Sequence, residues 1–210
     1  MLLGDERVRI VECCRRMAAA GLTVGTSGNV SERRGELVAV TPTGVDYDRL
    51  APEEVSVVDL VGGSVEGLEP SSELPMHLAV YRATDAAAVV HTHPLHATAL
   101  STVADELPGI HYLVMRLGGP VRVAPYARYG STELAEGSVR ALEDRSAVLL
   151  RNHGATTYGA TLAQAYERAE LLEWLCALYH RASQLGTPSI LGDAELAEAA
   201  AALSDYGQHP

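Results

Sequence analysis

Apolar residues along the chain alternate between helical spacing and short continuous runs. Residues 5–20 have apolar side chains at helical spacing, and Gly21 stands where a C-cap would end that helix. The same reasoning predicts further helices at about 73–83, 95–103, 131–143, 161–185 and 193–203. Short apolar runs predict strands at about 37–40, 55–61, 87–92, 121–123, 147–150 and 155–158.

The order of these elements favours one fold class. Several expected strands follow one another directly, whereas others are separated by helices, which fits a mixed sheet covered by helices on both faces better than a strictly parallel one. At 210 residues the chain is the size of one compact domain. We find no internal repeat, low-complexity tract or Pro/Ser-rich linker, so a single domain over residues 1–210 is expected.

Two of the expected strands end in histidines. His91 and His93 stand at positions i and i+2 at the end of an apolar run, so their side chains point to the same face. His153 follows a second apolar run. Three imidazoles are the ligand set of a catalytic zinc, and Glu73, at the start of an expected helix, could be a fourth ligand or a base. The alternative is that His91 and His93 are ordinary hydrogen-bonded strand histidines.

The remaining histidines show no comparable pattern. Pro94 breaks the alternation before His96, which we expect to pack near the ligands rather than bind. His77, His111 and His180 have no spacing that indicates a function, and the same holds for His209 near the C-terminus.

All 16 basic residues are arginine. Without lysine, no side chain can form a Schiff base with a carbonyl substrate or with pyridoxal phosphate, and the lysine of a P-loop is missing. Carbonyl chemistry in this chain would therefore need an electrophile such as a metal ion.

Three separate segments are rich in glycine and hydroxyl groups. They are Thr26-Ser27-Gly28-Asn29, Thr43-Gly44 and Ser71-Ser72. Backbone N–H groups in such turns bind anions, and Ser71-Ser72 precede an expected helix whose N-terminus favours negative charge. Each segment alone is typical of an ordinary turn. Together, beside Glu73, they predict a phosphate pocket next to the metal.

Overall charge narrows the classes of partner. The net charge of −11 and the pI near 5.1 argue against nucleic acid or an anionic membrane as the main partner, but not against a small anionic substrate.

Three cysteines make no disulfide framework, and there is neither a signal peptide nor an apolar stretch of about 18 residues. We expect a cytoplasmic protein.

Seven motifs in order resemble the class II aldolase/adducin family over roughly residues 5–206. The motifs are Gly25-Thr26-Ser27-Gly28-Asn29-Val30-Ser31, Thr41-Pro42-Thr43-Gly44, Pro70-Ser71-Ser72-Glu73, His91-Thr92-His93-Pro94, Ile110-His111-Tyr112, Ala124-Pro125-Tyr126 and Asn152-His153-Gly154. The resemblance implies an α/β fold, a three-layer αβα sandwich with a central mixed, largely antiparallel sheet covered by helices on both faces. It also implies a homotetramer with active sites at subunit interfaces.

The resemblance further assigns a role to each site residue. His91, His93 and His153 would hold one Zn²⁺ per subunit, or another divalent metal. Glu73 would be the fourth ligand and then the proton carrier. The residues implied to hold the substrate phosphate are Thr26, Gly28, Asn29, Thr43, Gly44, Ser71 and Ser72. Tyr112 would act in the active site of a neighbouring subunit, and Tyr206 would close over the substrate.

The implied reaction is reversible cleavage of a ketose 1-phosphate, such as L-fuculose 1-phosphate, to dihydroxyacetone phosphate and an aldehyde through an enediolate stabilised by zinc. Alternatives within the family are a pentulose 5-phosphate 4-epimerase (L-ribulose 5-phosphate), in which an aspartate usually replaces Glu73, and a methylthioribulose-1-phosphate dehydratase. A non-enzymatic alternative, an adducin-like assembly domain, would lack the metal ligands. Arg116 departs from the family pattern and stands either near the aldehyde or at a subunit interface.

Overall fold

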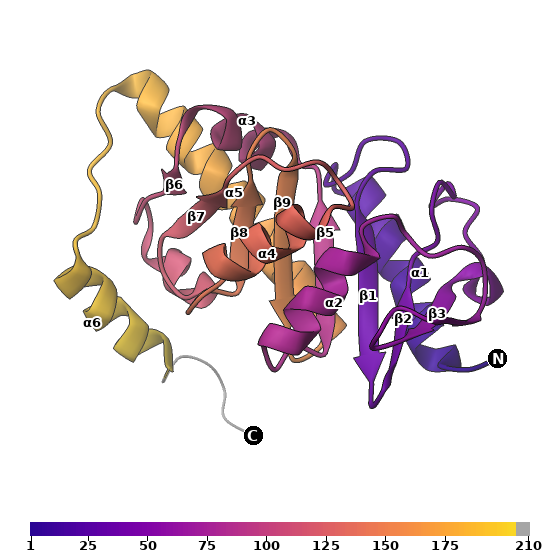
Figure 1. Cartoon of the computed structure of the whole chain (residues 1–210). Coiled ribbons are helices and arrows are strands. Elements are labelled where there is room, and N and C mark those ends of the chain that lie inside the picture. Colours follow the sequence, from indigo (N-terminus) through magenta and orange to yellow (C-terminus); the bar gives the residue numbers. More distant parts are fainter. Residues whose placement is uncertain (205–210) are drawn as a thin grey trace.

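The computed structural model describes residues 1–204, which form a nine-stranded sheet and its covering helices (Figure 1). The strands are β1 Asn29–Arg34, β2 Leu37–Val40, β3 Ser56–Asp59, β4 Ser64–Glu66, β5 Ala88–Thr92, β6 Glu106–Leu107, β7 Val121–Ala124, β8 Ala147–Leu150 and β9 Gly154–Gly159. The α-helices are α1 Gly4–Ala19, α2 Leu74–Ala83, α3 Leu95–Val103, α4 Thr132–Ala141, α5 Leu162–Leu185 and α6 Asp193–Ser204. Two 3₁₀ helices, η1 Pro52–Glu54 and η2 Tyr112–Leu117, complete the set.

The sheet is mixed and largely antiparallel. Its strand order is β4-β3-β2-β1-β5-β9-β8-β7-β6. Within the described residues, β7 and β8 are the one parallel pair, and the other neighbours run antiparallel. Strand β5, which contains His91 and ends one residue before His93, therefore lies in the middle of the sheet between β1 and β9.

Helices cover both faces of this sheet. On one face, α2 and α4 pack against alternate strand residues such as Val89 and Val148. On the other face, α1 and the first turns of α5 pack against Val30 and Val90, while α3 and the rest of α5 cover Leu149. The three-layer αβα sandwich expected from the sequence is confirmed (Figure 1).

Helix α6 follows an extended segment after α5 and lies away from the sheet (Figure 1). It packs against η2, where Leu196 is buried in the same apolar cluster as Leu117. The backbone N–H of Leu191 donates to the carbonyl of Gly109, which fixes the extended segment beside the chain that leads into η2.

Strands β1, β4 and β6 are absent from the elements that the apolar pattern predicts. In β1, Val30 is the only large apolar residue, and Ser31 is buried instead because its hydroxyl is hydrogen-bonded. Burial of a polar residue conceals the alternation by which a half-buried strand is recognised. None of the helices in residues 1–204 is long and apolar enough to cross a membrane.

Candidate active site

Three histidines meet because the strands that carry them are neighbours. Strand β5 pairs with β9 up to the contact between Thr92 and Ala155, and β9 returns from β8 through the tight turn that contains His153. This turn therefore lies beside the end of β5, where His91 and His93 stand. Gly154 permits the close approach, because a Cβ there would overlap the carbonyl oxygen of Thr92.

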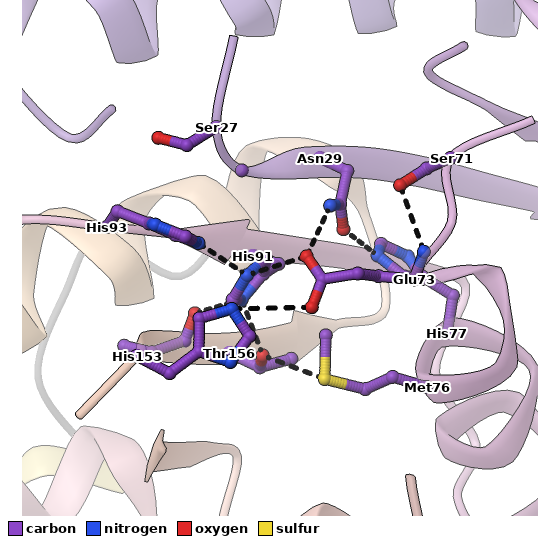
Figure 2. A network of polar contacts seen from close by, with 12 residues as sticks. Ser27, Asn29, Ser71, Glu73, Met76, His77, His91, His93, His153 and Thr156 are labelled. Carbon is purple, nitrogen blue, oxygen red and sulfur yellow. Dashed lines mark hydrogen bonds and ion pairs between the residues drawn. The ribbon is translucent and has the colours of Figure 1, made fainter. Parts of the chain in front are cut away.

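The fourth member of the cluster is Glu73, the residue directly before α2. Its Oε2 lies 3.1 Å from His91 Nε2, and its Oε1 lies 3.4 Å from His153 Nε2 (Figure 2). His93 Nε2 lies 2.9 Å from His91 Nε2. One ligand atom from each of the four residues falls within 4.8 Å of the others. The structure thus brings together Glu73, His91, His93 and His153, the four residues predicted from the sequence as metal ligands.

The hydrogen bonds of His91 direct its free nitrogen toward the cluster. His91 Nδ1 lies 2.9 Å from the carbonyl oxygen of Ala155 and 3.1 Å from Thr156 Oγ1. A carbonyl oxygen only accepts, so Nδ1 carries a proton, and Nε2 is the nitrogen that faces the other three residues. This arrangement is typical of a metal-binding imidazole held by a backbone acceptor.

The protonation states also suit a cation. Burial, together with repulsion from neighbouring imidazoles, lowers the pKa of His93 to about 3 and that of His153 to about 4. Burial alone would raise the pKa of Glu73, but His91, Asn29 and His153 outweigh it, and the pKa lies well below its usual range. At neutral pH His93 and His153 therefore offer neutral imidazole nitrogens and Glu73 offers a carboxylate, the forms that bind metals.

The donor set passes a simple geometric test for a divalent cation. Two ligands about 2.0–2.1 Å from a tetrahedral zinc lie about 3.3 Å apart, which is close to the 2.9, 3.1 and 3.4 Å that separate the nearest pairs of this cluster. Glu73 Oε1 is buried and accepts no hydrogen bond, so its capacity as an acceptor is unsatisfied in the structure. A buried acceptor without a partner is costly, and a bound cation would satisfy it.

A cavity of about 410 Å³ opens beside the cluster. All seven residues that the sequence analysis assigned to the phosphate line it. The described lining residues are Thr26, Ser27, Gly28, Asn29, Pro42, Thr43, Gly44, Ser71, Ser72, Glu73, His93, Tyr126, Ala127, Tyr129, Asn152 and His153. The backbone N–H of Thr43 donates to Glu69, and that of Ser71 donates to Thr41. These bonds hold two of the three hydroxyl-rich segments against one another.

Asn29 stands where the cavity meets the cluster. Its Nδ2 donates to Glu73 Oε2 at 2.9 Å, and its Oδ1 lies 2.5 Å from His77 Nε2 (Figure 2). Both ends of the amide are therefore held by protein groups, even though the residue lines the cavity wall.

The structure does not place Tyr112 in this cavity. Tyr112 is half-exposed and borders a separate hollow between η2 and α6, together with Arg116. The sequence expected Tyr112 to act in a neighbouring subunit, and a single chain does not test that role. Tyr206 lies outside the described residues.

Several residues of the site were missed at the level of sequence. His77 was given no role, yet it is completely buried and contacts Asn29. Its spacing from Glu73, four residues along a helix, was the available signal, because such residues share a face. Tyr129 follows no recognisable pattern, and Tyr126 was quoted only as part of a motif, but both line the cavity.

Comparison with known proteins fits this site. The family described as the class II aldolase and adducin N-terminal domain matches residues 8–180. A 5-deoxy-D-ribulose 1-phosphate aldolase of Bacillus thuringiensis serovar kurstaki is 39% identical, over 99% of this chain and 100% of the relative. An L-fuculose phosphate aldolase of Escherichia coli K12 is 38% identical, over 95% of this chain and 94% of the relative.

A solved structure shows the same similarity to aldolases. An L-fuculose 1-phosphate aldolase superimposes with a TM-score of 0.94 at 36% identity, covering 97% of this chain and 98% of the other. The chain belongs to the class II aldolase and adducin family. The family and the enzyme class expected from the sequence, a carbon–carbon lyase, are confirmed.

Proposed function

We propose that the chain is a metal-dependent aldolase that reversibly cleaves a ketose 1-phosphate, such as L-fuculose 1-phosphate, to dihydroxyacetone phosphate and an aldehyde. One observation carries this proposal. Four ligand atoms suited to a divalent cation stand at the edge of a cavity whose remaining wall is rich in hydroxyl and glycine residues. A phosphorylated sugar needs both halves of such a site.

We expect the part of the cavity that is rich in hydroxyl and glycine residues to bind the phosphate without a positively charged side chain. No arginine occurs among the described residues that line the cavity, so the donors are hydroxyls such as Thr43 and Ser72, amides and backbone N–H groups. Ser71 and Ser72 precede the ten-residue helix α2, whose N-terminus favours a bound anion. We assign the phosphate to the segments around Thr26, Thr43 and Ser71.

The metal half is held by His91, His93, His153 and Glu73. We expect zinc there, because three imidazoles and a carboxylate are common ligands of that ion. When bound, the cation would supply Lewis-acid stabilisation of the negative charge that develops on the sugar oxygens during cleavage.

The chain's own residues move the protons. The partner subunit's Tyr112 takes the proton from the C4 hydroxyl, and the C4–O bond becomes the aldehyde carbonyl as the C3–C4 bond breaks. The electron pair of that bond moves toward C2. Glu73, which takes up a proton from solvent once the sugar has bound and before the site closes, delivers that proton to C3 and so completes dihydroxyacetone phosphate, and the partner subunit's Tyr112 returns its proton to solvent when the products leave. Catalysis of this kind needs a carboxyl group close to the reacting carbon, and Glu73 lines the cavity.

The names of the similar proteins suggest two candidate substrates, both of them ketose 1-phosphates. L-Fuculose 1-phosphate and 5-deoxy-D-ribulose 1-phosphate share their first three carbons and release the same dihydroxyacetone phosphate, while the aldehydes differ in length. The 5-deoxy sugar is favoured as a second candidate by the 39% identity with an aldolase of that name. The phosphate cavity and the four-residue cluster serve both substrates equally.

We further propose that this single domain works in the cytoplasm as a homotetramer with active sites at subunit interfaces. The position of Tyr112 supports this. It lies outside the cavity of its own chain and is half-exposed, as a residue that completes a neighbouring site would be.

A panel of ketose 1-phosphates, pentulose 5-phosphates and unphosphorylated ketoses tests the function. Coupled detection of dihydroxyacetone phosphate should show release from one or more ketose 1-phosphates and none from the unphosphorylated sugars. Epimerised pentulose 5-phosphate without release of dihydroxyacetone phosphate would instead establish the epimerase, and loss of water from methylthioribulose 1-phosphate the dehydratase.

A further inference from the structure

Five buried polar side chains from α2 and β1 interleave behind the candidate active site. Glu73, His77 and Tyr81 stand at positions i, i+4 and i+8, and Asn29 and Ser31 stand at i and i+2 of the strand. Four helical residues advance about 6 Å and two strand residues about 6.6–6.8 Å, so the two series keep step. The strand residues therefore fit between successive helix residues.

The contacts form one unbroken series. Asn29 Nδ2 lies 2.9 Å from Glu73 Oε2, and Asn29 Oδ1 lies 2.5 Å from His77 Nε2 (Figure 2). On the far side of the ring, His77 Nδ1 lies 2.7 Å from Ser31 Oγ, which lies 2.7 Å from the Tyr81 hydroxyl. None of these five residues is more than 6% exposed.

The chemistry of the groups fixes the direction of every hydrogen bond. The Glu73 carboxylate can only accept, so the amide NH₂ of Asn29 faces it and the amide oxygen faces His77. That oxygen also only accepts, so His77 Nε2 carries the ring proton. Nδ1 then accepts from Ser31, and Ser31 accepts from Tyr81. All donors point toward Glu73.

The surroundings of His77 reinforce this order. Burial lowers the pKa of His77 to about 3, so the ring is neutral and carries a single proton. With one proton, His77 can donate to Asn29 or to Ser31 but not to both. If the proton moved to Nδ1, Asn29 Oδ1 would lose its donor, and the amide could turn its oxygen toward the carboxylate, which would repel it.

We propose that His77 is a positioning residue: it fixes the orientation of the Asn29 amide, and Asn29 in turn holds Oε2 of Glu73 so that the carboxylate faces the three imidazoles. The inference rests on the proposed function only in naming Glu73 as a metal ligand and proton carrier. Groups that hydrogen-bond to metal ligands, as Asn29 does to Glu73, commonly change metal affinity or activity by about 10–100-fold when altered, and His77 acts through Asn29.

Two substitutions separate positioning from packing. His77→Gln keeps an amide N–H about as far from the backbone as Nε2, so it can still donate to Asn29. His77→Asn keeps a polar group near Ser31 but is too short to reach Asn29. As a matched control, His180→Asn makes the same change on an exposed histidine of α5.

The first readout is zinc affinity, measured by competition with a chromophoric chelator. We expect His77→Asn to raise the Kd for zinc about tenfold or more, and His77→Gln and His180→Asn to stay within about threefold of the unsubstituted protein. In the aldolase assay, His77→Asn should lower kcat with little change in KM. Equal zinc affinity in the two His77 variants would overturn the inference.

The second readout needs neither a substrate nor a variant that folds. Nitrogen-15 NMR of the metal-free, unsubstituted protein at pH 7 should show His77 as the neutral tautomer with the proton on Nε2. A proton on Nδ1, or a charged ring, would disprove the proposed order of hydrogen bonds. If the protein cleaved no sugar phosphate, the proposed function would fail, while zinc affinity and the tautomer would still decide the role of His77.

Discussion

Gly28 lies directly against the backbone of His91. A Cβ at position 28 would stand 2.8 Å from the His91 carbonyl oxygen, and the φ of Gly28 is +81°, a conformation that L side chains rarely adopt. The loop before β1, which lines the cavity, is thus built directly onto β5, the strand that carries the candidate metal ligand His91.

Gly28→Ala should therefore damage both stability and the site. Gly35 is a matched control, because its φ is +61° but nothing lies within 4 Å of an added Cβ. Both alanine variants share the backbone strain, of about 1 kcal/mol. We expect Gly28→Ala to lose about 1–3 kcal/mol more in free energy of unfolding, measured with urea, because of the clash. Equal losses of unfolding free energy in the two variants would show that the loop around Gly28 moves to accept the added Cβ without cost.

Glu73→Gln should keep the fold and lose most of the turnover. The substitution preserves the shape of the side chain but removes both the ligand charge and the ability to carry a proton. We expect kcat to fall by about 10²–10⁴-fold in the dihydroxyacetone phosphate assay, with the circular dichroism spectrum unchanged. Glu69→Gln, an exposed change nearby, is the control. Unchanged activity in Glu73→Gln would refute the assigned role.

The metal-free protein should become less stable as the pH falls below about 6.5. Burial holds the pKa of His77 at about 3, whereas the unfolded chain binds a proton near pH 6.5. Between about pH 6 and pH 4 the unfolded state therefore binds one more proton at this residue, so stability rises with pH. His77→Gln should reduce the slope of the free energy of unfolding against pH by about 1.4 kcal/mol per unit. An unaltered slope would mean that His77 is protonated in the folded protein.

Subunit mixing tests where Tyr112 acts. Glu73→Gln and Tyr112→Phe chains should each be nearly inactive as pure homotetramers. In a ring where each site takes Glu73 from one subunit and Tyr112 from the next, random mixing of equal amounts restores about a quarter of the sites. Recovery of activity after the two variants are unfolded and refolded together is the measurement. No recovery, with mixed tetramers confirmed by mass spectrometry, would place Tyr112 and Glu73 in the same chain's site.

Sequence spacing was sufficient for much of the sheet and its helices. The apolar runs before His91 and His153 became β5 and β8, and the helix expected at 95–103 became α3. These elements bury large apolar residues, whose spacing is visible in one dimension.

The polar interior was not visible in the same way. Ser31 and His77 are fully buried, but each depends on a partner 46 residues away in sequence, so no local pattern reveals them. The three candidate histidines could be predicted because they stand at the ends of apolar strand runs, and Glu73 because it stands at the start of an expected helix. Tyr129 reaches the cavity from the loop before α4, and only the packing of that loop brings it there.

Stepwise return of zinc to metal-free protein tests the central claim most directly. If His91, His93, His153 and Glu73 hold the cation that cleavage requires, the chelated protein should release no dihydroxyacetone phosphate from a ketose 1-phosphate that the untreated protein cleaves. Activity should then rise in proportion to added zinc and level off at about one equivalent per chain. Full activity in protein shown to contain no metal would contradict the account.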